Sequence, residues 1–149
     1  MTVQRPHFRH LDPEECTALL ARHHVGRLAY TQRNRIDIVP IHYVLGEGWL
    51  YGRTAAGHKL EVLEHNRWVA FEVDEIEGAF DWMSVVVKGG VYLLRADGSE
   101  DEIANYRIAL DAIRTVAPFA LTPEDPVPER AIIFRIHIDE MQGRAASTR

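Results

Sequence analysis

The stretch IDIVPIHYVLGEGWLYGR (residues 36–53) holds two runs of β-forming residues joined by a glycine-rich turn. Residues 36–45 and 49–53 are predicted strands, and the tripeptide GEG between them predicts a β-hairpin. A link this short joins only antiparallel strands, because a parallel pair needs a crossover of about a dozen residues or more. The first run alternates, and five of its residues share one face. These are Ile36, Ile38, Pro40, His42 and Val44.

Outside the hairpin, four further runs predict strands, and helices are predicted only around them. The strands are residues 25–31, 68–75, 84–96 and 131–138, and the helices are residues 13–23, a short one inside 54–66, and 99–116. Asp12, Pro13 and Glu15 form a capping box with proline at the start of the first helix. Three links between strands are too short to hold a helix. We therefore expect a mainly β fold, a six-stranded antiparallel β-barrel with peripheral helices, in a single domain (1–149) whose barrel spans about 25–138.

Charge and composition limit the classes of function. The net charge is −5, which argues against a nucleic-acid-binding protein, since the phosphate backbone requires a basic face. No apolar run is long enough to span a membrane, and the start MTVQRPHFRH lacks the apolar core of a signal peptide. The one cysteine, Cys16, cannot form an internal disulfide, which suits a reducing compartment. We expect a cytoplasmic protein with no nucleic-acid and no membrane partner.

The segment YGRTAAGHKLEVLEHN (residues 51–66) combines positive charge with small side chains where a helix is expected to begin. Thr54 is the expected N-cap, and the tripeptide AAG leaves the backbone N–H groups of the first turn open to a ligand. Arg53 and Lys59 add charge, and His58 adds a donor. These features favour a site for an anion, most naturally a phosphate. The alternative is an ordinary helix start with exposed basic side chains. The expected buried stripe of this helix is Ala56, Leu60 and Leu63.

Three segments in order carry a resemblance to a known family. They are GRLAY (26–30), VPIHYVLGEGWLYGRTAAGHKLEVLEHNRWVAFEVDE (39–75) and DWMSVVVKGGVYLL (81–94). Together they resemble the pyridoxamine 5'-phosphate oxidase-like flavoproteins, closest to the small branch that includes nitroimidazole-resistance reductases. The resemblance implies the FMN-binding split barrel, a six-stranded antiparallel barrel that forms a homodimer with FMN in each of two interface clefts. Loops 76–82 and 117–130, together with the other subunit, are expected to form the outer wall of each cleft.

The resemblance also implies a set of flavin-binding residues. In the family a basic pair that opens the short helix holds the phosphate, and His58 and Lys59 stand at those positions. His58 replaces an arginine that is common in relatives, so the charge there becomes pH-dependent. The other matching positions are Pro40, Ile41, His42 and Tyr43, whose backbone runs beside the flavin ring; Arg53 and Thr54 at the strand end; and Trp82, Ser84 and Val85 at the neighbouring strand.

Departures from the family pattern bear on the activity and the cofactor. The chain ends IDEMQGRAASTR, without the Arg-Leu-x-Pro segment with which authentic pyridoxamine-phosphate oxidases bind substrate, and this argues against that activity. A deazaflavin cofactor ranks second to FMN, as does haem. His42 beside the proposed flavin is open to three readings: a proton donor, a haem ligand, or a packed and hydrogen-bonded histidine.

Other histidines, aromatic residues and the cysteine are expected to be structural. His7 and His10 have helical i, i+3 spacing, but they lie in an expected frayed terminus without further ligands, so we expect no metal site. Cys16 is expected to be a buried thiol. Core or dimer-interface packing is the expectation for three aromatic residues, Trp49, Trp68 and Phe71. No residue is identified as catalytic.

The expected function follows from the cofactor, because FMN carries hydride or single electrons whatever the protein around it. We expect an FMN-dependent oxidoreductase acting on a small, flat, electron-poor molecule, with reduced nicotinamide as a possible electron donor. The alternative is a flavin- or haem-binding protein of the same fold without turnover.

Overall fold

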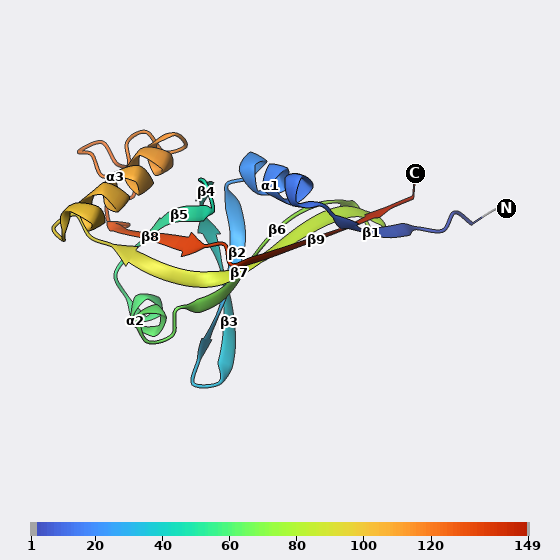
Figure 1. Ribbon diagram of the computed structural model, residues 1–149, viewed down its shortest axis with the longest axis horizontal. Coiled ribbons are helices and arrows are strands. Elements are labelled where there is room, and N and C mark those ends of the chain that lie inside the picture. The colour runs from blue at the N-terminus through green and yellow to red at the C-terminus, as the bar shows by residue number, and fades with distance from the viewer. Residues whose placement is uncertain (1–2, 149) are drawn as a thin grey trace.

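In a computed structural model, which describes residues 3–148, the chain forms nine strands and three helices (Figure 1). The helices are α1 (Pro13–Arg22), α2 (His58–His65) and α3 (Glu100–Arg114). The strands are β1 (His7–Leu11), β2 (Val25–Gln32), β3 (Arg35–His42), β4 (Val44–Leu45), β5 (Trp49–Thr54), β6 (Trp68–Gly78), β7 (Asp81–Leu94), β8 (Ile132–His137) and β9 (Glu140–Ser147).

All strand pairs of the described chain are antiparallel, and they follow one path, β3-β2-β6-β7-β8-β5-β4, from which β9 and then β1 branch at β7. Over residues 3–148 no ladder closes this path into a complete barrel. Its two ends, β3 and β4, are nevertheless consecutive in the chain, with Tyr43 alone between them. The predicted antiparallel, mainly β fold with peripheral helices is confirmed, whereas the predicted six-stranded barrel is corrected to a nine-stranded sheet that is not closed within the described chain.

Strand β7 joins the two halves of the sheet. Along one edge it pairs with β6, while its other edge is shared between β9 over 82–88 and β8 over 91–94. The chain turns from β8 into β9 at this boundary, where Asp139 N donates to Lys88 O over 3.0 Å. A Cβ atom on Gly89 would lie only 1.7 Å from His137 O. A residue without a side chain is therefore required at this crossing.

The core lies on the concave side of the sheet, under α1. Phe71 is buried there among leucine and valine side chains of the neighbouring strands. Tyr43 packs edge-on against Phe71, with ring centroids 4.9 Å apart, and its hydroxyl donates to Leu20 O over 2.6 Å. The predicted start of α1 is confirmed, because Asp12 Oδ1 accepts from Glu15 N and Glu15 Oε1 accepts from Asp12 N.

Both ends of the described chain are strands, contrary to the sequence-based expectation. Residues 7–11 form β1 and pair with β9 from His7↔Ser147 to Leu11↔Gly143, so they are neither frayed nor helical. His7 and His10 are three residues apart in a strand and therefore lie on opposite faces. The sheet consequently extends well beyond the predicted barrel limits of 25–138. β9, with the sequence EMQGRAAS, has few β-branched residues, and it becomes a strand because β1 and β7 flank it.

The start of α2 also differs from the prediction. Thr54 is the last residue of β5, paired with Ile132 of β8, and its hydroxyl donates to Ala55 O over 3.4 Å. Gly57 occupies the N-cap position without a side-chain cap. The buried residues of this helix are Val62 and Leu63, whereas Ala56 is exposed and Leu60 is half-buried. Thr54 continues as a strand because β8 supplies a ladder partner that local sequence does not reveal.

The remaining elements lie close to their predicted bounds. α3 falls inside the predicted 99–116, and Ser99 is its N-cap, with Glu102 N donating to Ser99 Oγ over 3.2 Å. β7 begins three residues earlier than expected, and the predicted strand 36–45 is interrupted at Tyr43. Within the described part of the chain, no helix is long and apolar enough to cross a bilayer.

The crossing at Gly89 predicts that alanine substitutions at two adjacent glycines differ greatly in their effect on stability. Gly89→Ala should lower the free energy of unfolding by about 1 to 3 kcal/mol, because the added methyl group meets backbone that cannot move without breaking the β8–β9 corner. Gly90→Ala is the matched control, since its Cβ meets only side-chain atoms of Tyr92 and Arg67 at 3.4–3.5 Å. Urea unfolding of both variants measures the difference, and equal stabilities would contradict the role given to Gly89.

Candidate functional site

A cavity of about 370 Å³ opens between the end of β3, strand β5, the end of α3 and the loop that follows α3. This volume is within the range of small-molecule sites. Its lining combines aromatic and apolar side chains with four basic ones, and no carboxylate of residues 3–148 lines it. The basic residues are His24, His42, Arg53 and Arg130, and the other residues include Tyr43, Tyr51, Ile113, Val116, Pro126 and Val127.

The cavity brings together three residues that the sequence assigned to a flavin site. His42 is exposed on β3, Tyr43 follows it, and Arg53 lies near the end of β5. Alternation along β3 sends Pro40 and His42 outward, while Ile41 is buried in the core. The backbone N–H of Tyr43 donates to His24 O over 2.9 Å, so in this chain it is already satisfied.

Arg53 does not present a free charge to the cavity. Its Nη1 lies 2.6 Å from Asp125 Oδ2 and its Nη2 lies 3.1 Å from Asp125 Oδ1, which is a two-pronged ion pair. The side chains of Arg53 and Asp125 are only 9% and 1% exposed. The Arg53 guanidinium holds the pKa of Asp125 well below its usual range. Asp125 was not expected from the sequence, because the proline-rich loop gave no sign of which strand it would contact.

Lys59 and Arg130 form the cationic part of the site. Burial, and secondly the charge of Arg130, lower the pKa of Lys59 below the ordinary lysine value. Thr54 pairs with Ile132, which places the segment before α2 near the end of the loop before β8, so the two charges lie close enough to act on each other. Within residues 3–148 neither side chain forms an ion pair with a carboxylate. Arg130 lines the cavity, and its unneutralised charge together with that of Lys59 suits an anion there.

Arg130 is a residue of the candidate site that sequence reasoning missed. The available signal was its position, as the single basic residue of the loop 117–130 that was expected to wall the cleft. Pro126, Val127 and Arg130 of this loop do line the cavity.

His58 points away from Lys59, although the two are neighbours on α2. Its Nε2 lies 2.5 Å from Gln32 Nε2 and its Nδ1 lies 4.0 Å from Glu61 Oε2. It lines a different hollow, between α2 and the turn at Arg33 and Asn34 that joins β2 to β3. Thr54, which was grouped with these residues, is buried.

The three predicted residues of β7 lie elsewhere in this chain. Val85 is fully buried in the core, so only its backbone could meet a ligand. Ser84 faces the opposite side of the sheet and its hydroxyl donates to Glu72 Oε2 over 2.9 Å. Trp82 lies further along that same side, with its ring 6.4 Å from that of Phe8. Strands β2 and β6 separate Ser84 from His42, a distance of about 14 Å along the sheet.

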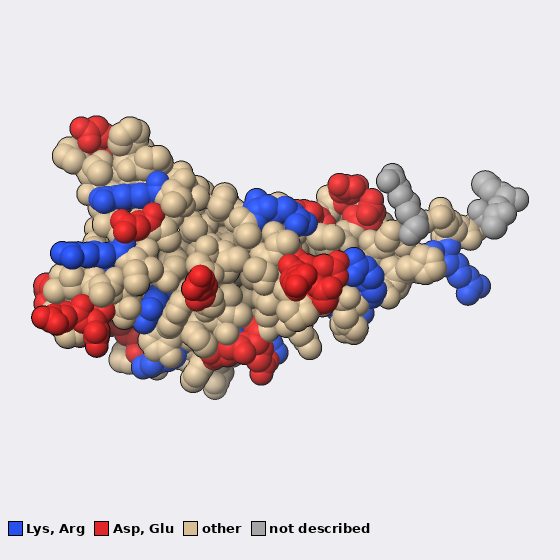
Figure 2. All heavy atoms as spheres, turned by 45° about the horizontal axis from the view of Figure 1, so that its top comes forward, with Lys and Arg blue, Asp and Glu red and all other residues tan. Residues whose placement is uncertain are grey.

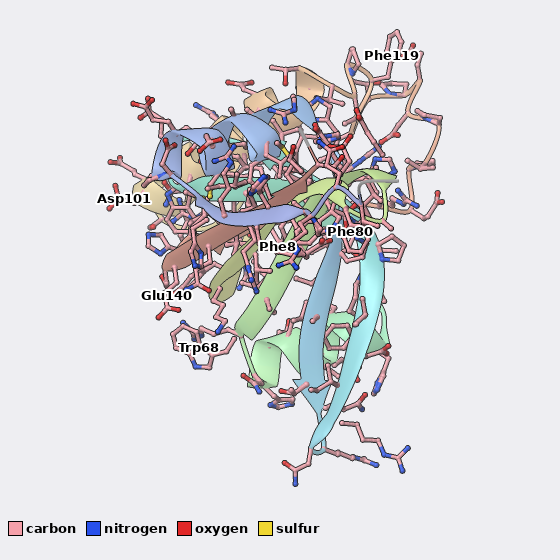
Figure 3. All side chains as sticks on the ribbon, turned by 90° about the vertical axis from the view of Figure 1, so that its right-hand side faces the viewer. Phe8, Trp68, Phe80, Asp101, Phe119 and Glu140 are labelled. Carbon is pink, nitrogen blue, oxygen red and sulfur yellow. The ribbon has the colours of Figure 1, made fainter. Side chains whose placement is uncertain are left out.

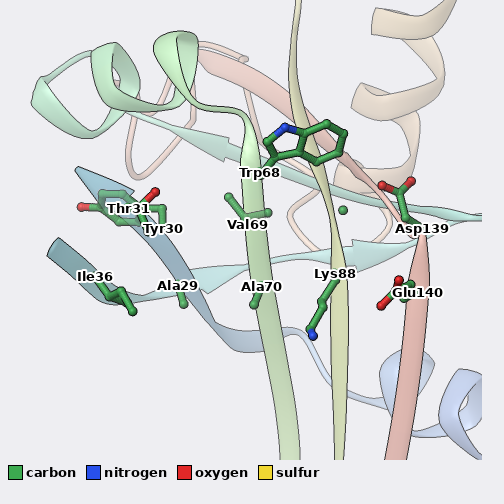
Figure 4. Close-up of a pocket in the computed structure, with 11 residues that line it drawn as sticks. Ala29, Tyr30, Thr31, Ile36, Trp68, Val69, Ala70, Lys88, Asp139 and Glu140 are labelled. Atoms are coloured by element: carbon green, nitrogen blue, oxygen red, sulfur yellow. The ribbon is translucent and has the colours of Figure 1, made fainter. Parts of the chain in front are cut away.

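The outer side of the sheet has charged and apolar parts. Arg27 lies 2.8 Å from Glu72 and 2.9 Å from Asp74, and burial together with Asp74 raises the pKa of Glu72. Beside this cluster lies an apolar groove of about 430 Å³, with Ile36, Trp68 and Lys88 around it (Figure 4). On the face in Figure 2, acidic and basic groups are interspersed, and no basic patch extends across it.

The fold and the cavity define a class of protein, an antiparallel split-barrel protein with cations at one end of a largely apolar cavity. Comparison with models of known families matches residues 12–145 to the pyridoxamine 5'-phosphate oxidase family, and the chain belongs to that family. The family resemblance of the sequence is thereby confirmed.

Individual relatives agree with this assignment. An uncharacterized protein of Rhizobium meliloti (strain 1021) is 31% identical over 147 residues, which cover 93% of this chain and 95% of that protein. The crystal structure of a FAD-binding protein from Mesorhizobium loti is 28% identical with a TM-score of 0.75, covering 96% and 99% of the two chains. That of a putative 5-nitroimidazole antibiotic resistance protein from Bacteroides thetaiotaomicron (18% identical, TM-score 0.71, 96% and 89% covered) shares the fold.

The repulsion between Lys59 and Arg130 predicts that the pKa of Lys59 changes when Arg130 is removed. Arg130→Ala should raise the pKa of Lys59, because a repelling charge is removed, yet leave it below the ordinary value, because burial remains. The chain has only two lysines, Lys59 and Lys88, so ¹³C-dimethylated protein gives two easily assigned lysine signals. A Lys59 titration identical in wild type and Arg130→Ala would show that the two cations do not share a site.

Proposed function

We propose that this protein binds a flavin nucleotide whose phosphate lies between Lys59 and Arg130 and whose ring system enters the cavity toward His42 and Tyr43. The single observation that carries the proposal is Arg130, an unneutralised cation that lines a cavity reaching the end of β3 and whose charge acts on Lys59. Family membership supports a flavin as the ligand, and the neighbour from Mesorhizobium loti is described as FAD-binding.

We propose FMN as the resident flavin. One pair of cations matches the single phosphate of FMN. Tyr51 and the apolar end of α3 line the cavity and could pack against a planar ring. FAD contains the same riboflavin phosphate and would use the same cations. The flavin released by heat from purified protein, identified by mass, distinguishes FMN, FAD and a deazaflavin.

We further propose that the protein is an oxidoreductase acting on a small, electron-poor molecule. A bound flavin supplies hydride or one-electron transfer. Ile113, Val116 and Val127 would exclude water from one side of the cavity, and His42 is a titratable side chain in its lining. The absorption spectrum separates flavin from haem, for which His24 and His42 are candidate ligands. Anaerobic mixing with reduced nicotinamide then separates a competent enzyme from a flavin carrier.

Removing the charge of Lys59 should weaken the binding of FMN but not the binding of riboflavin. Lys59→Ala loses a charge-assisted hydrogen bond to phosphate, worth roughly 1.5 to 3 kcal/mol, so FMN affinity should fall about ten- to a hundredfold. Riboflavin has no phosphate, and its affinity should stay nearly unchanged. Fluorescence titrations of apoprotein with both ligands make the comparison, with the exposed Arg107→Ala on α3 as a charge-matched control. Equal losses for both ligands would mean that Lys59 supports the fold and not a phosphate.

We also propose a cytoplasmic homodimer that forms through the outer face of β2, β3 and β6. This face is not covered by a helix, and it exposes Ile36, Ile38 and Trp68 by 73%, 61% and 62% (Figure 3). Contiguous exposed apolar surface of this kind marks an association site. Ser84 and Trp82 lie on the same side of the sheet, so a second copy is what could bring them to a cleft with His42. Cys16, a buried thiol, suits a reducing compartment.

The dimer proposal predicts different effects on dimer dissociation for glutamate substitutions at two exposed isoleucines, Ile38 and Ile108. Ile38→Glu should raise the dimer dissociation constant by at least about tenfold, because a carboxylate would be buried in the interface without a partner. Ile108→Glu on α3 is the control, since Ile108 is 55% exposed but lies on a different face. Light scattering over a range of concentrations measures both. A wild-type protein that stays monomeric at micromolar concentration would overturn the proposal.

A further inference from the structure

Asp125 is the most heavily hydrogen-bonded carboxylate beside the cavity, and it lies in the loop between α3 and β8. Besides the two bonds from Arg53, it accepts one from Leu121 N to Oδ2 over 2.8 Å and one from Val127 N to Oδ1 over 3.0 Å. Both oxygens therefore serve as acceptors for the strand and for the loop at once. The loop is fastened to β5 by one buried side chain.

The fastened segment also forms one wall of the cavity. Leu121, which bonds to Asp125, has φ +57°, a conformation that costs energy for a residue with a side chain. Val127, also bonded to Asp125, lines the cavity, and Arg130 follows three residues later. Arg130 N in turn donates to Val127 O over 3.0 Å. A chain of contacts thus runs from Arg53 through Asp125 and Val127 to the cation at the cavity rim.

We propose that Asp125 is a positioning residue: anchored by Arg53, it folds the loop so that Arg130 stands at the cavity, and Arg53 serves as this anchor instead of contacting the phosphate. The identity of the ligand in this inference rests on the proposed flavin function. The placement of Arg130 by Asp125 is independent of that function.

Burial favours this role for Arg53 over direct phosphate binding. A phosphate on Arg53 would have to displace a carboxylate that is 1% exposed and would leave two backbone N–H groups without an acceptor. Within residues 3–148, neither Lys59 nor Arg130 forms an ion pair with a carboxylate. The positive charge available to a ligand therefore belongs to them.

The first arm of the test needs no flavin. In Asp125→Asn, which keeps the side-chain shape, Arg130 should leave Lys59, and the pKa of Lys59 should rise as far as it does in Arg130→Ala. The double variant should show no further rise. Asp111→Asn on the exposed side of α3 is the control for loss of a carboxylate. A Lys59 titration unchanged by Asp125→Asn but raised by Arg130→Ala would overturn the proposal.

The second arm measures the preference for FMN over riboflavin. Asp125→Asn and Arg130→Ala should each reduce that preference by roughly tenfold, with no further reduction in the double variant. If the role of Asp125 is purely structural, Asp125→Asn should weaken the binding of FMN and riboflavin equally and leave the preference for FMN unchanged. If Arg53 is the phosphate ligand, Asp125→Asn should increase the preference for FMN. Either result contradicts the inference.

If Asp125→Asn does not fold, Arg53→Lys replaces it, because lysine keeps the charge but cannot bridge both carboxylate oxygens. If the wild type binds neither flavin, the proposed function fails, while the Lys59 titration still decides whether Asp125 positions Arg130.

Discussion

The close approach of Gly89 to the backbone of His137 is the constraint on which the rest of the molecule depends. At that point β7 changes partner from β9 to β8, so one strand belongs to both halves of the sheet. Within the sheet, β5 and β8 are connected to β2 and β3 through this crossing, and the chain itself joins β3 to β4 through Tyr43. A side chain there would separate the two halves by more than a hydrogen bond can span.

The candidate site is assembled from β5 and the adjoining α2 together with a loop that is distant from them in sequence. β5 carries Arg53, α2 carries Lys59, and the loop before β8 carries Arg130. The sheet holds the first of these rigidly, whereas the loop depends on the buried carboxylate of Asp125. Rigid strands therefore form one side of the cavity, and a loop held by a few polar contacts forms the other.

Sequence reasoning succeeded where a local pattern determines the outcome. Short runs of strand-like sequence gave β2, β6 and β8, and the capping box gave the start of α1. It failed where a distant partner decides. β9 is a strand because of β1 and β7, and Thr54 stays in β5 because Ile132 pairs with it. Asp125 and Arg130 were missed for the same reason, since only the folded loop brings them to Arg53 and Lys59.

The pairing of β1 with β9 places the two ends of the described chain side by side, at the opposite end of the molecule from α3 (Figure 1). Because His7 lies opposite Ser147, a linker of a few residues could join the ends without disturbing the sheet. The chain could then be reopened at the exposed Glu47 and Gly48 of the β4–β5 turn. The same geometry means that a mechanical load applied between the ends would open the β1–β9 ladder one residue pair at a time, far from the cavity.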